Sequence, residues 1–376
     1  MRIGIVCYPT YGGSGVLATE LGKALADKGH LIHFITYQQP VRLNGFNPNI
    51  FYHEVQVPTY PLFDYPPYES ALSSTLVDVI MNHQLDLLHV HYAIPHASTA
   101  YMAKQILKKQ GKDIPVVTTL HGTDITLVGK DKTYAPVVTF SINESDAITA
   151  VSRDLREQTY KYFDIKKDIR VIYNFVDSKR FHRHRRSSCG NALAPHGEKI
   201  LIHVSNFRPI KRVKDVVLIF KKVLEKIPAK LLLIGDGPDR PLIESMCREL
   251  GICGDIRFIG KQEQLEDILG CADLFILPSE YESFGLAALE AMASEVPVIS
   301  SNAGGLPEIN IEGKTGFLSP VGDVDAMAEN AIMLFQDPSL LDHFRKQAYQ
   351  QAKKFEIARI IPQYETLYQE LLPQPV

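Results

Sequence analysis

The chain has 376 residues, more than one hydrophobic core usually holds, so we expect two domains. It is 45% hydrophobic and 22% charged, which is typical of a soluble globular protein, and its net charge of -3 gives no general reason to expect nucleic-acid binding. No apolar run approaches the roughly 18 residues of a membrane helix, and the first residues lack a secretory pattern. We therefore expect a cytoplasmic protein without a membrane partner.

The first half of the chain alternates short apolar strands with helices. A strand at residues 3–6 precedes a helix at 16–28, and the further strands expected are 31–36, 87–91, 116–119, 147–150 and 170–173. Strands that alternate with helices predict a parallel sheet covered on both faces.

The alternation stops in a basic segment without periodicity, residues 179–198, which we interpret as a linker. It then resumes with strands expected at 200–204, 230–234, 256–259, 274–277 and 296–300. We predict an α/β protein with two doubly wound, Rossmann-like domains that face a cleft. The expected domains are 1–178 and 179–357, and a C-terminal helix at about 358–376 returns to the first domain. Ligands of such sheets bind beyond the carboxyl ends of strands, where every motif below lies.

The loop after the first strand contains Gly12, Gly13, Ser14 and Gly15. Glycines let the backbone approach an anion closely, the following helix N-terminus favours negative charge, and Ser14 adds a hydroxyl donor. The loop lacks the full dinucleotide fingerprint, which disfavours a nicotinamide cofactor. A tight turn without a ligand is the alternative.

Histidines end two later strands. His89 and His91 share one face of their strand, which suggests a metal, but no carboxylate or cysteine at ligand spacing supports it, and we expect none. His121 follows Thr119 in the next loop, where an imidazole can donate or accept a hydrogen bond near a reacting centre. A structural role in the loop is the alternative for His121.

Ser152 and Arg153 close another strand and begin a helix. Ser152 suits the N-cap position. Arg153 falls in the first helical turn, where the helix dipole disfavours a cation. Because a bound anion would offset that cost, we predict that Arg153 contacts an anionic acceptor.

The second half carries a cationic loop, with Arg208, Lys211 and Arg212 after its first strand. Cations at this place suit a diphosphate, which carries more charge than helix amides neutralise alone. A solvated basic loop is the alternative. Two glycine turns, at 235–238 and 304–305, end later strands and are equally consistent with purely structural turns.

The sharpest signal is a pair of carboxylates, Glu282 and Glu290, around a Phe284-Gly285 turn that opens an apolar helix. Unpaired N–H groups at a helix N-terminus form an anion site. Carboxylates beside it can accept hydrogen bonds from sugar hydroxyls. A ligand that carries an anionic group next to hydroxyls has the chemistry of a sugar nucleotide.

This carboxylate pair, together with the Gly235-Asp236-Gly237-Pro238 and Gly304-Gly305 turns, resembles the retaining GT-B glycosyltransferases of family 4 over essentially the whole chain. Segments at 12–15, 91–97, 118–126 and 203–208 are most similar to the members that act in bacillithiol biosynthesis. The resemblance implies that N-acetylglucosamine passes from UDP-N-acetylglucosamine to the hydroxyl of L-malate with retention of the α configuration, the first step of that pathway. It implies no cofactor and no metal.

The resemblance also implies roles for particular positions. The catalytic residues would be His121, Arg208, Lys211 and Glu282. The donor would contact Gly13, Asn206, Lys261, Ser283, Phe284, Gly285, Leu286 and Glu290. Malate has two carboxylates that need donors and a cation, and our candidates are Ser14, Tyr92, Thr119 and Arg153. Many members carry an arginine where this chain has Asn206, with Arg208 two residues later.

Other functions stay open at this point. A UDP-sugar transferase of the same fold could use a lipid or glycan acceptor, although no large apolar N-terminal surface helix favours a lipid. A sensor that binds a UDP-sugar without turnover and a UDP-sugar epimerase are further alternatives. The sequence leaves open whether the chain forms a homo-oligomer.

Overall fold

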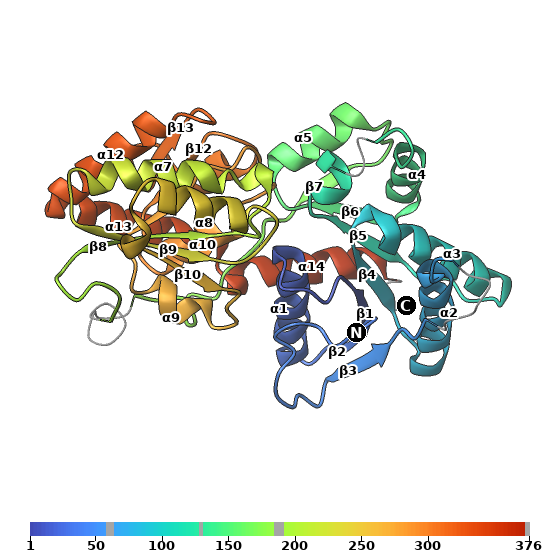
Figure 1. Ribbon diagram of the computed structural model, residues 1–376. Helices are drawn as coiled ribbons and strands as arrows, with labels where there is room; N and C mark the ends of the chain where they lie inside the picture. Colours follow the sequence, from blue (N-terminus) through green and yellow to red (C-terminus); the bar gives the residue numbers. More distant parts are fainter. Residues whose placement is uncertain (58–63, 128–130, 184–191, 373–376) are drawn as a thin grey trace. The chain divides into compact units, whose positions relative to one another are not determined.

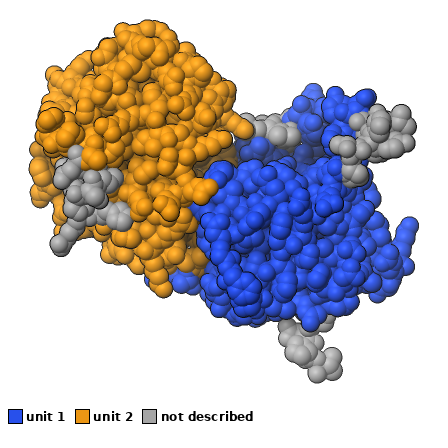
Figure 2. Space-filling view, turned by 60° about the horizontal axis from the view of Figure 1, so that its bottom comes forward, with its two compact units in different colours: residues 1–174, 358–376 blue, residues 175–357 orange. Residues whose placement is uncertain are grey.

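The computed structural model describes residues 1–57, 64–127, 131–183 and 192–372. The chain divides into two compact units, drawn in separate colours in Figure 2: unit 1 is Met1–Asn174 with Ala358–Val376, and unit 2 is Phe175–Ile357. Each unit contains one parallel sheet with helices on its faces (Figure 1). The predicted α/β class is confirmed. In the described ranges, no helix is long and apolar enough to cross a membrane.

Unit 1 holds a seven-stranded sheet in the order β3-β2-β1-β4-β5-β6-β7. Its strands are β1 (Arg2–Val6), β2 (Leu31–Thr36), β3 (Ile50–Glu54), β4 (Leu87–His91), β5 (Val116–Leu120), β6 (Ala147–Ala150) and β7 (Ile169–Val171). Its helices are α1 (Gly13–Asp27), α2 (Tyr68–His83), α3 (Ser98–Lys109), α4 (Ala135–Glu144), α5 (Arg153–Tyr162) and α14 (Ile357–Leu371). The strand order reverses between β1 and β4, and ligands of doubly wound sheets bind at such a switch point.

The C-terminal helix α14 packs in unit 1, as the sequence predicts. The Tyr368 hydroxyl lies 2.7 Å from Nδ1 of His89 on β4. Glu365 pairs with Lys28 and with His30 next to α1. The last helix therefore stabilises the sheet beneath the loops that follow β4 and β5.

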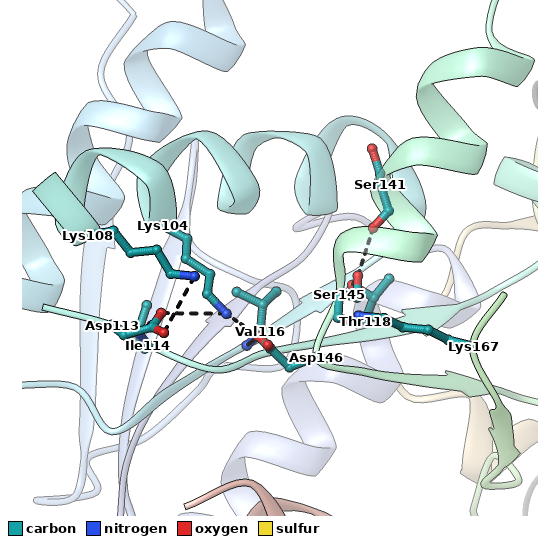
Figure 3. A network of polar contacts seen from close by, with 10 residues as sticks. All are labelled: Lys104, Lys108, Asp113, Ile114, Val116, Thr118, Ser141, Ser145, Asp146 and Lys167. Carbon is teal, nitrogen blue, oxygen red and sulfur yellow. Dashed lines mark hydrogen bonds and ion pairs between the residues drawn. The ribbon is translucent and has the colours of Figure 1, made fainter. Parts of the chain in front are cut away.

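A charge network around one buried lysine joins α3 to the strands beside it (Figure 3). Lys104, which is 6% exposed, donates to Asp146 at 2.5 Å, and the same carboxylate accepts the N–H of Val116 at 2.7 Å. Asp113 lies 3.6 Å from the Lys104 ammonium. Because a buried ammonium is costly without an anionic partner, this network fixes α3 against the starts of β5 and β6.

Unit 2 holds a six-stranded sheet in the order β10-β9-β8-β11-β12-β13, with its switch point between β8 and β11. Its strands are β8 (Lys199–Val204), β9 (Ala229–Ile234), β10 (Ile256–Gly260), β11 (Leu274–Leu277), β12 (Val298–Ser301) and β13 (Gly316–Ser319). Its helices are α7 (Val213–Leu224), α8 (Arg240–Glu249), α9 (Leu265–Leu269), α10 (Leu286–Ala293), α11 (Leu306–Ile309), α12 (Val324–Gln336) and α13 (Pro338–Ala352).

The segment expected to be a linker, 179–198, is described only in part, because residues 184–191 lie outside the described ranges. At its start, Arg180 forms an ion pair with Glu266 of α9, with 2.8 Å between Nε and Oε1. This end of the segment is therefore attached to unit 2.

Candidate active site

The loop after β1 and the end of β4 meet in unit 1, where Ser14 Oγ and the Tyr92 hydroxyl are 2.6 Å apart. Tyr92 has a φ of 85°, a left-handed conformation that costs energy in a residue with a Cβ and that gathers at functional sites. Gly15 lets the loop fold tightly, because a Cβ there would lie 2.3 Å from the carbonyl oxygen of Tyr8. The structure thus brings together two of the predicted acceptor residues.

Helix α1 begins after Gly12, and in the described part of the chain no side chain caps its N-terminus. Its first N–H groups, which include Gly13 and Ser14, are therefore available to an anion. Helix α5 differs, since Ser152 Oγ accepts the N–H of Leu155 at 3.0 Å. This confirms the N-cap role predicted for Ser152. Arg153 starts the same helix and is exposed, on a different strand-to-helix connection from Ser14 and Tyr92.

Hydrogen-bonded histidines lie below these loops. Nδ1 of His91 and Nε2 of His121 are 2.8 Å apart. His89 contacts Thr119 Oγ1 at 2.7 Å through Nε2, and Thr119 in turn contacts Thr149 at 2.7 Å. Thr119 is only 1% exposed, so its hydroxyl is engaged inside the unit. Both ring nitrogens of His89 have hydrogen-bond partners.

Burial keeps these imidazoles neutral. It lowers the pKa of His121 and of His89 to about 3, and it lowers the pKa of His91 well below its ordinary value. At neutral pH, His121 can therefore donate or accept a hydrogen bond but carries no positive charge.

Asp124 is a residue that the sequence analysis did not select. It is 2% exposed and accepts the N–H groups of Ala93 at 2.9 Å and Gly122 at 3.0 Å. These bonds join the loop after β4 to the loop after β5. Burial raises the pKa of Asp124 to about 6. In the sequence, its position three residues after His121 was the signal that could have identified Asp124 as a candidate site residue.

In unit 2, hydrogen bonds of His203 fix the loop that follows β8. His203 contacts the carbonyl of Ile276 on β11 and the hydroxyl of Ser205, both at 2.8 Å. Phe207 is fully buried, whereas its neighbours Asn206 and Arg208 are exposed. The loop therefore anchors one ring in the core and presents the predicted donor residues to solvent.

Lys211 and Glu282 lie together, with 2.6 Å between Nζ and Oε1. Ser279 Oγ donates to the same carboxylate oxygen at 2.8 Å. The backbone joins the two loops as well, because the N–H of Glu280 donates to the carbonyl of Ile210 at 2.8 Å. Two of the four predicted catalytic residues thus form one ion pair.

The glycine turns have packing reasons. A Cβ on Gly235 would lie 1.7 Å from the carbonyl oxygen of Ser205, and one on Gly237 would lie 2.0 Å from that of Asn206. A Cβ on Gly304 would lie 2.1 Å from the carbonyl oxygen of Glu282. Both turns therefore pack closely against the loops that carry the predicted donor residues, and this packing explains why they contain glycine.

Helix α10 starts after Gly285, whose φ of 93° suits glycine. As at α1, no described side chain caps this N-terminus, so the N–H groups near Leu286 can donate hydrogen bonds to an anion. Phe284 is buried beneath the turn and Ser283 is half-buried. Glu290 is 7% exposed on the second turn of the helix.

Comparison with known proteins identifies the family. Models of "Glycosyltransferase Family 4" and "Glycosyl transferases group 1" match residues 11–180 and 189–351. The chain is 46% identical to the N-acetyl-alpha-D-glucosaminyl L-malate synthase of Bacillus anthracis, over 99% of this chain and 97% of that protein. The chain belongs to glycosyltransferase family 4. It is also 29% identical to an uncharacterised glycosyltransferase of Methanocaldococcus jannaschii, with 82% of each chain covered.

Solved structures show that this glycosyltransferase has the GT-B fold. Sucrose-phosphate synthase from Thermosynechococcus elongatus matches with a TM-score of 0.83 at 22% identity, covering 99% of both chains. Anabaena HepE in complex with UDP and glucose matches with a TM-score of 0.83 at 19% identity, covering 99% of this chain and 100% of that one. Such identities establish the fold alone, and the fold is the one that the sequence predicts.

Within this glycosyltransferase, the predicted residues fall into two sets. Unit 1 carries Gly13, Ser14, Tyr92, Thr119, His121 and Arg153, and unit 2 carries Asn206, Arg208, Lys211, Lys261, Glu282, Ser283, Phe284, Gly285, Leu286 and Glu290. Lys261 is exposed just after β10, next to Gly260, whose carbonyl accepts the N–H of Gly235 at 2.9 Å. The substrate contacts assigned to these residues remain predictions.

Proposed function

We propose that this glycosyltransferase transfers N-acetylglucosamine from UDP-N-acetylglucosamine to the hydroxyl of L-malate, with retention of the α configuration. The observation that carries the proposal is 46% identity over 99% of the chain to a protein named for that product. The Anabaena structure that holds UDP and glucose supports a UDP-sugar as the donor of this fold.

The residues predicted to bind the sugar donor would stabilise the leaving diphosphate. The N–H groups at the start of α10 and the Lys211 ammonium supply positive potential where negative charge develops, which is often worth several kcal/mol. A phosphate oxygen would compete with Glu282 for Lys211, because the two side chains are only 2.6 Å apart. Glu282 could then accept a sugar hydroxyl, and Glu290 would accept the ribose hydroxyls.

The protein need not supply the two catalytic carboxylates of a retaining glycosidase. In the front-face reaction proposed for this family, the diphosphate itself helps to take the acceptor proton. The uncharged His121 suits a position near the reacting carbon, because a neutral imidazole hydrogen-bonds the sugar without repelling positive charge on the ring. Lys211, Arg208 and helix ends would take the place of a metal ion.

Malate would bind to unit 1. Its carboxylates suit the N-terminus of α1 and the hydroxyl pair of Ser14 and Tyr92, in which one hydroxyl donates to the other at 2.6 Å and the second O–H is left for a ligand. Arg153 would supply a cation, and Thr119 would act on the site through His89, with which it is hydrogen-bonded.

An acceptor screen with the purified full chain tests this proposal. UDP release from UDP-N-acetylglucosamine is measured with L-malate, D-malate, succinate, a diacylglycerol and an oligosaccharide, each with and without EDTA. We expect release that depends on L-malate and is unchanged by EDTA. Release with the lipid or the oligosaccharide instead would favour the other transferase functions, and UDP-sugar binding without turnover would favour a sensor.

A further inference from the structure

Three histidines of unit 1 converge away from the loops described above. His33 lies on β2, His53 lies on β3, and His83 is the last residue of α2. One ring nitrogen from each lies within 4.8 Å of the others. Strands β2 and β3 lie across β1 from β4 and β5, which carry His91 and Thr119. This histidine cluster is therefore separate from the proposed acceptor site.

The sheet register explains why the cluster forms. His33 pairs with Phe51 and Ile35 pairs with His53 across the parallel strands β2 and β3. Alternate residues of a strand share a face, so all four side chains point to one face of the sheet. Ile35 packs there in the same hydrophobic cluster as residues of α2. The end of α2 brings His83 to the same place.

The spacing of the rings suits a metal ion. Nδ1 of His33 and Nε2 of His53 are 2.9 Å apart. The ring centroids of His33 and His53 are 5.2 Å apart, and each lies 4.8 Å from the ring of His83. Zinc bonds to histidine at about 2.0–2.1 Å, which places nitrogens of a tetrahedral site about 3.3 Å apart. The 2.9 Å separation of His33 and His53 is close to that value, and the three nitrogens all lie within 4.8 Å of one another, so small ring rotations would complete the site.

The burial of the three rings and the charges near them also bear on metal binding. The three rings run from the interior to the surface, because His33 is buried, His53 is half-buried and His83 is exposed. The negative charge of Asp78 acts at His53 and favours a bound cation, whereas the positive charge of Arg2 acts at His33 and opposes one. His83 is exposed and gives an ion a path from solvent to the buried His33.

We propose that His33, His53 and His83 form a binding site for a divalent transition metal ion of the zinc type, with water as the fourth ligand. Neutral imidazoles suit zinc, cobalt, nickel and copper, and they do not suit magnesium or calcium. The ion would join the end of α2 to β2 and β3. It would stabilise unit 1 and take no part in sugar transfer.

The test is a metal titration of the untagged, EDTA-treated full chain. Zinc binding is measured by calorimetry, and cobalt binding by the visible absorption of a tetrahedral complex. We expect one ion per chain and a rise in the unfolding temperature of unit 1 with zinc. His83→Ala should weaken zinc binding by about 10-fold or more. The matched control is His343→Ala, which also removes an exposed helical histidine and should leave affinity unchanged.

Two results would overturn the metal site. One is that the chain binds zinc no more tightly than it binds magnesium. The other is that His83→Ala and the wild-type chain have equal affinity for zinc. If His33→Ala fails to fold, the more exposed His53→Ala, alone and with His83→Ala, still tests the ligand set. L-malate-dependent turnover is measured in EDTA, so a failure of the metal site and a failure of the proposed transfer are distinguishable.

Discussion

The role proposed for Lys211 depends on the groups around it. Its ammonium lies 2.6 Å from Glu282, beside a helix N-terminus that no described side chain caps. Two sources of positive potential thus lie at one end of the unit 2 sheet. A diphosphate placed there would exchange Glu282 for phosphate oxygens as the partner of the lysine.

Replacing Lys211 with alanine should lower kcat by about 100-fold or more, because the leaving diphosphate loses a charged donor. Folding should survive, since Ser279 still donates to Glu282 at 2.8 Å. Steady-state kinetics and circular dichroism check both parts. Lys214→Ala, on the exposed side of α7, is the matched control and should keep wild-type turnover. Wild-type kcat in the Lys211 variant would remove this lysine from the mechanism.

Replacing Tyr92 with phenylalanine removes one hydroxyl of the pair with Ser14. We expect KM for L-malate to rise about 10-fold, since a hydrogen bond to a charged group is worth about 1.5–3 kcal/mol. The KM for UDP-N-acetylglucosamine should stay constant. Tyr101→Phe, on α3, is the control. An unchanged malate KM would exclude the Tyr92 hydroxyl from acceptor binding.

At the scale of elements, the polar network of Figure 3 makes α3 sensitive to one buried lysine. Lys104→Ala should lower the free energy of unfolding by about 2 kcal/mol, because Asp146 loses its cation in a partly buried place. Lys108→Ala should cost less than about 0.5 kcal/mol, since Lys108 and Asp113 are both exposed. Urea denaturation measures both variants, and equal losses would contradict the burial argument.

Most strands of both sheets were predictable because buried parallel strands form continuous apolar runs. The exceptions are β3 and β13, which lie at sheet edges. In β3, Phe51 and Glu54 are exposed and His53 is half-buried, so no buried run marks the strand. Strand β13 is only four residues long and begins with Gly316. Neither pattern is distinguishable from a loop before the neighbouring strand is known.

The relative positions of the residues proposed to bind the sugar donor were predictable in a different way from those of the residues proposed to bind the acceptor. Glu282 and Glu290 belong to one strand-turn-helix unit, so their spacing carries the geometry. The acceptor side depends on contacts between distant segments, such as Ser14 with Tyr92 and His91 with His121. Asp124 was missed for the same reason, because its partners on other loops become visible only in the folded chain.

At the scale of the whole molecule, the two units should differ in their response to acid. Burial lowers the pKa of His33 and His96 to about 4 and that of His89 and His121 to about 3, and all four lie in unit 1. The comparable group in the described part of unit 2 is His203, with a pKa of about 4.

The sign of the effect follows from proton binding. An unfolded histidine binds a proton near pH 6.5, well above these folded values, so the unfolded chain binds more protons as the pH falls from 6.5 towards 4. Stability therefore falls over that window, by up to about 1.4 kcal/mol per pH unit for each histidine. Asp124, with its pKa raised to about 6, adds stability as the pH falls, but it is one group against four histidines.

We predict that unit 1 loses more stability than unit 2 between pH 7 and pH 5. The chain has no tryptophan, so single reporters can follow each unit by fluorescence. Phe140→Trp, beside Tyr101, reports on unit 1, and Phe317→Trp, stacked on Phe344, reports on unit 2. Urea titrations at both pH values give the two losses. Equal losses would show that the buried histidines do not set acid stability.

The transfer of α-linked N-acetylglucosamine to malate is tested most directly by the structure of the product. Proton NMR and mass spectrometry of a reaction that contains only the purified chain, UDP-N-acetylglucosamine and L-malate identify the linkage and the anomer. We predict one product, N-acetylglucosamine joined to the malate hydroxyl, with the small anomeric coupling of an α-glycoside. A β-glycoside, free N-acetylglucosamine alone or no product would contradict this assignment.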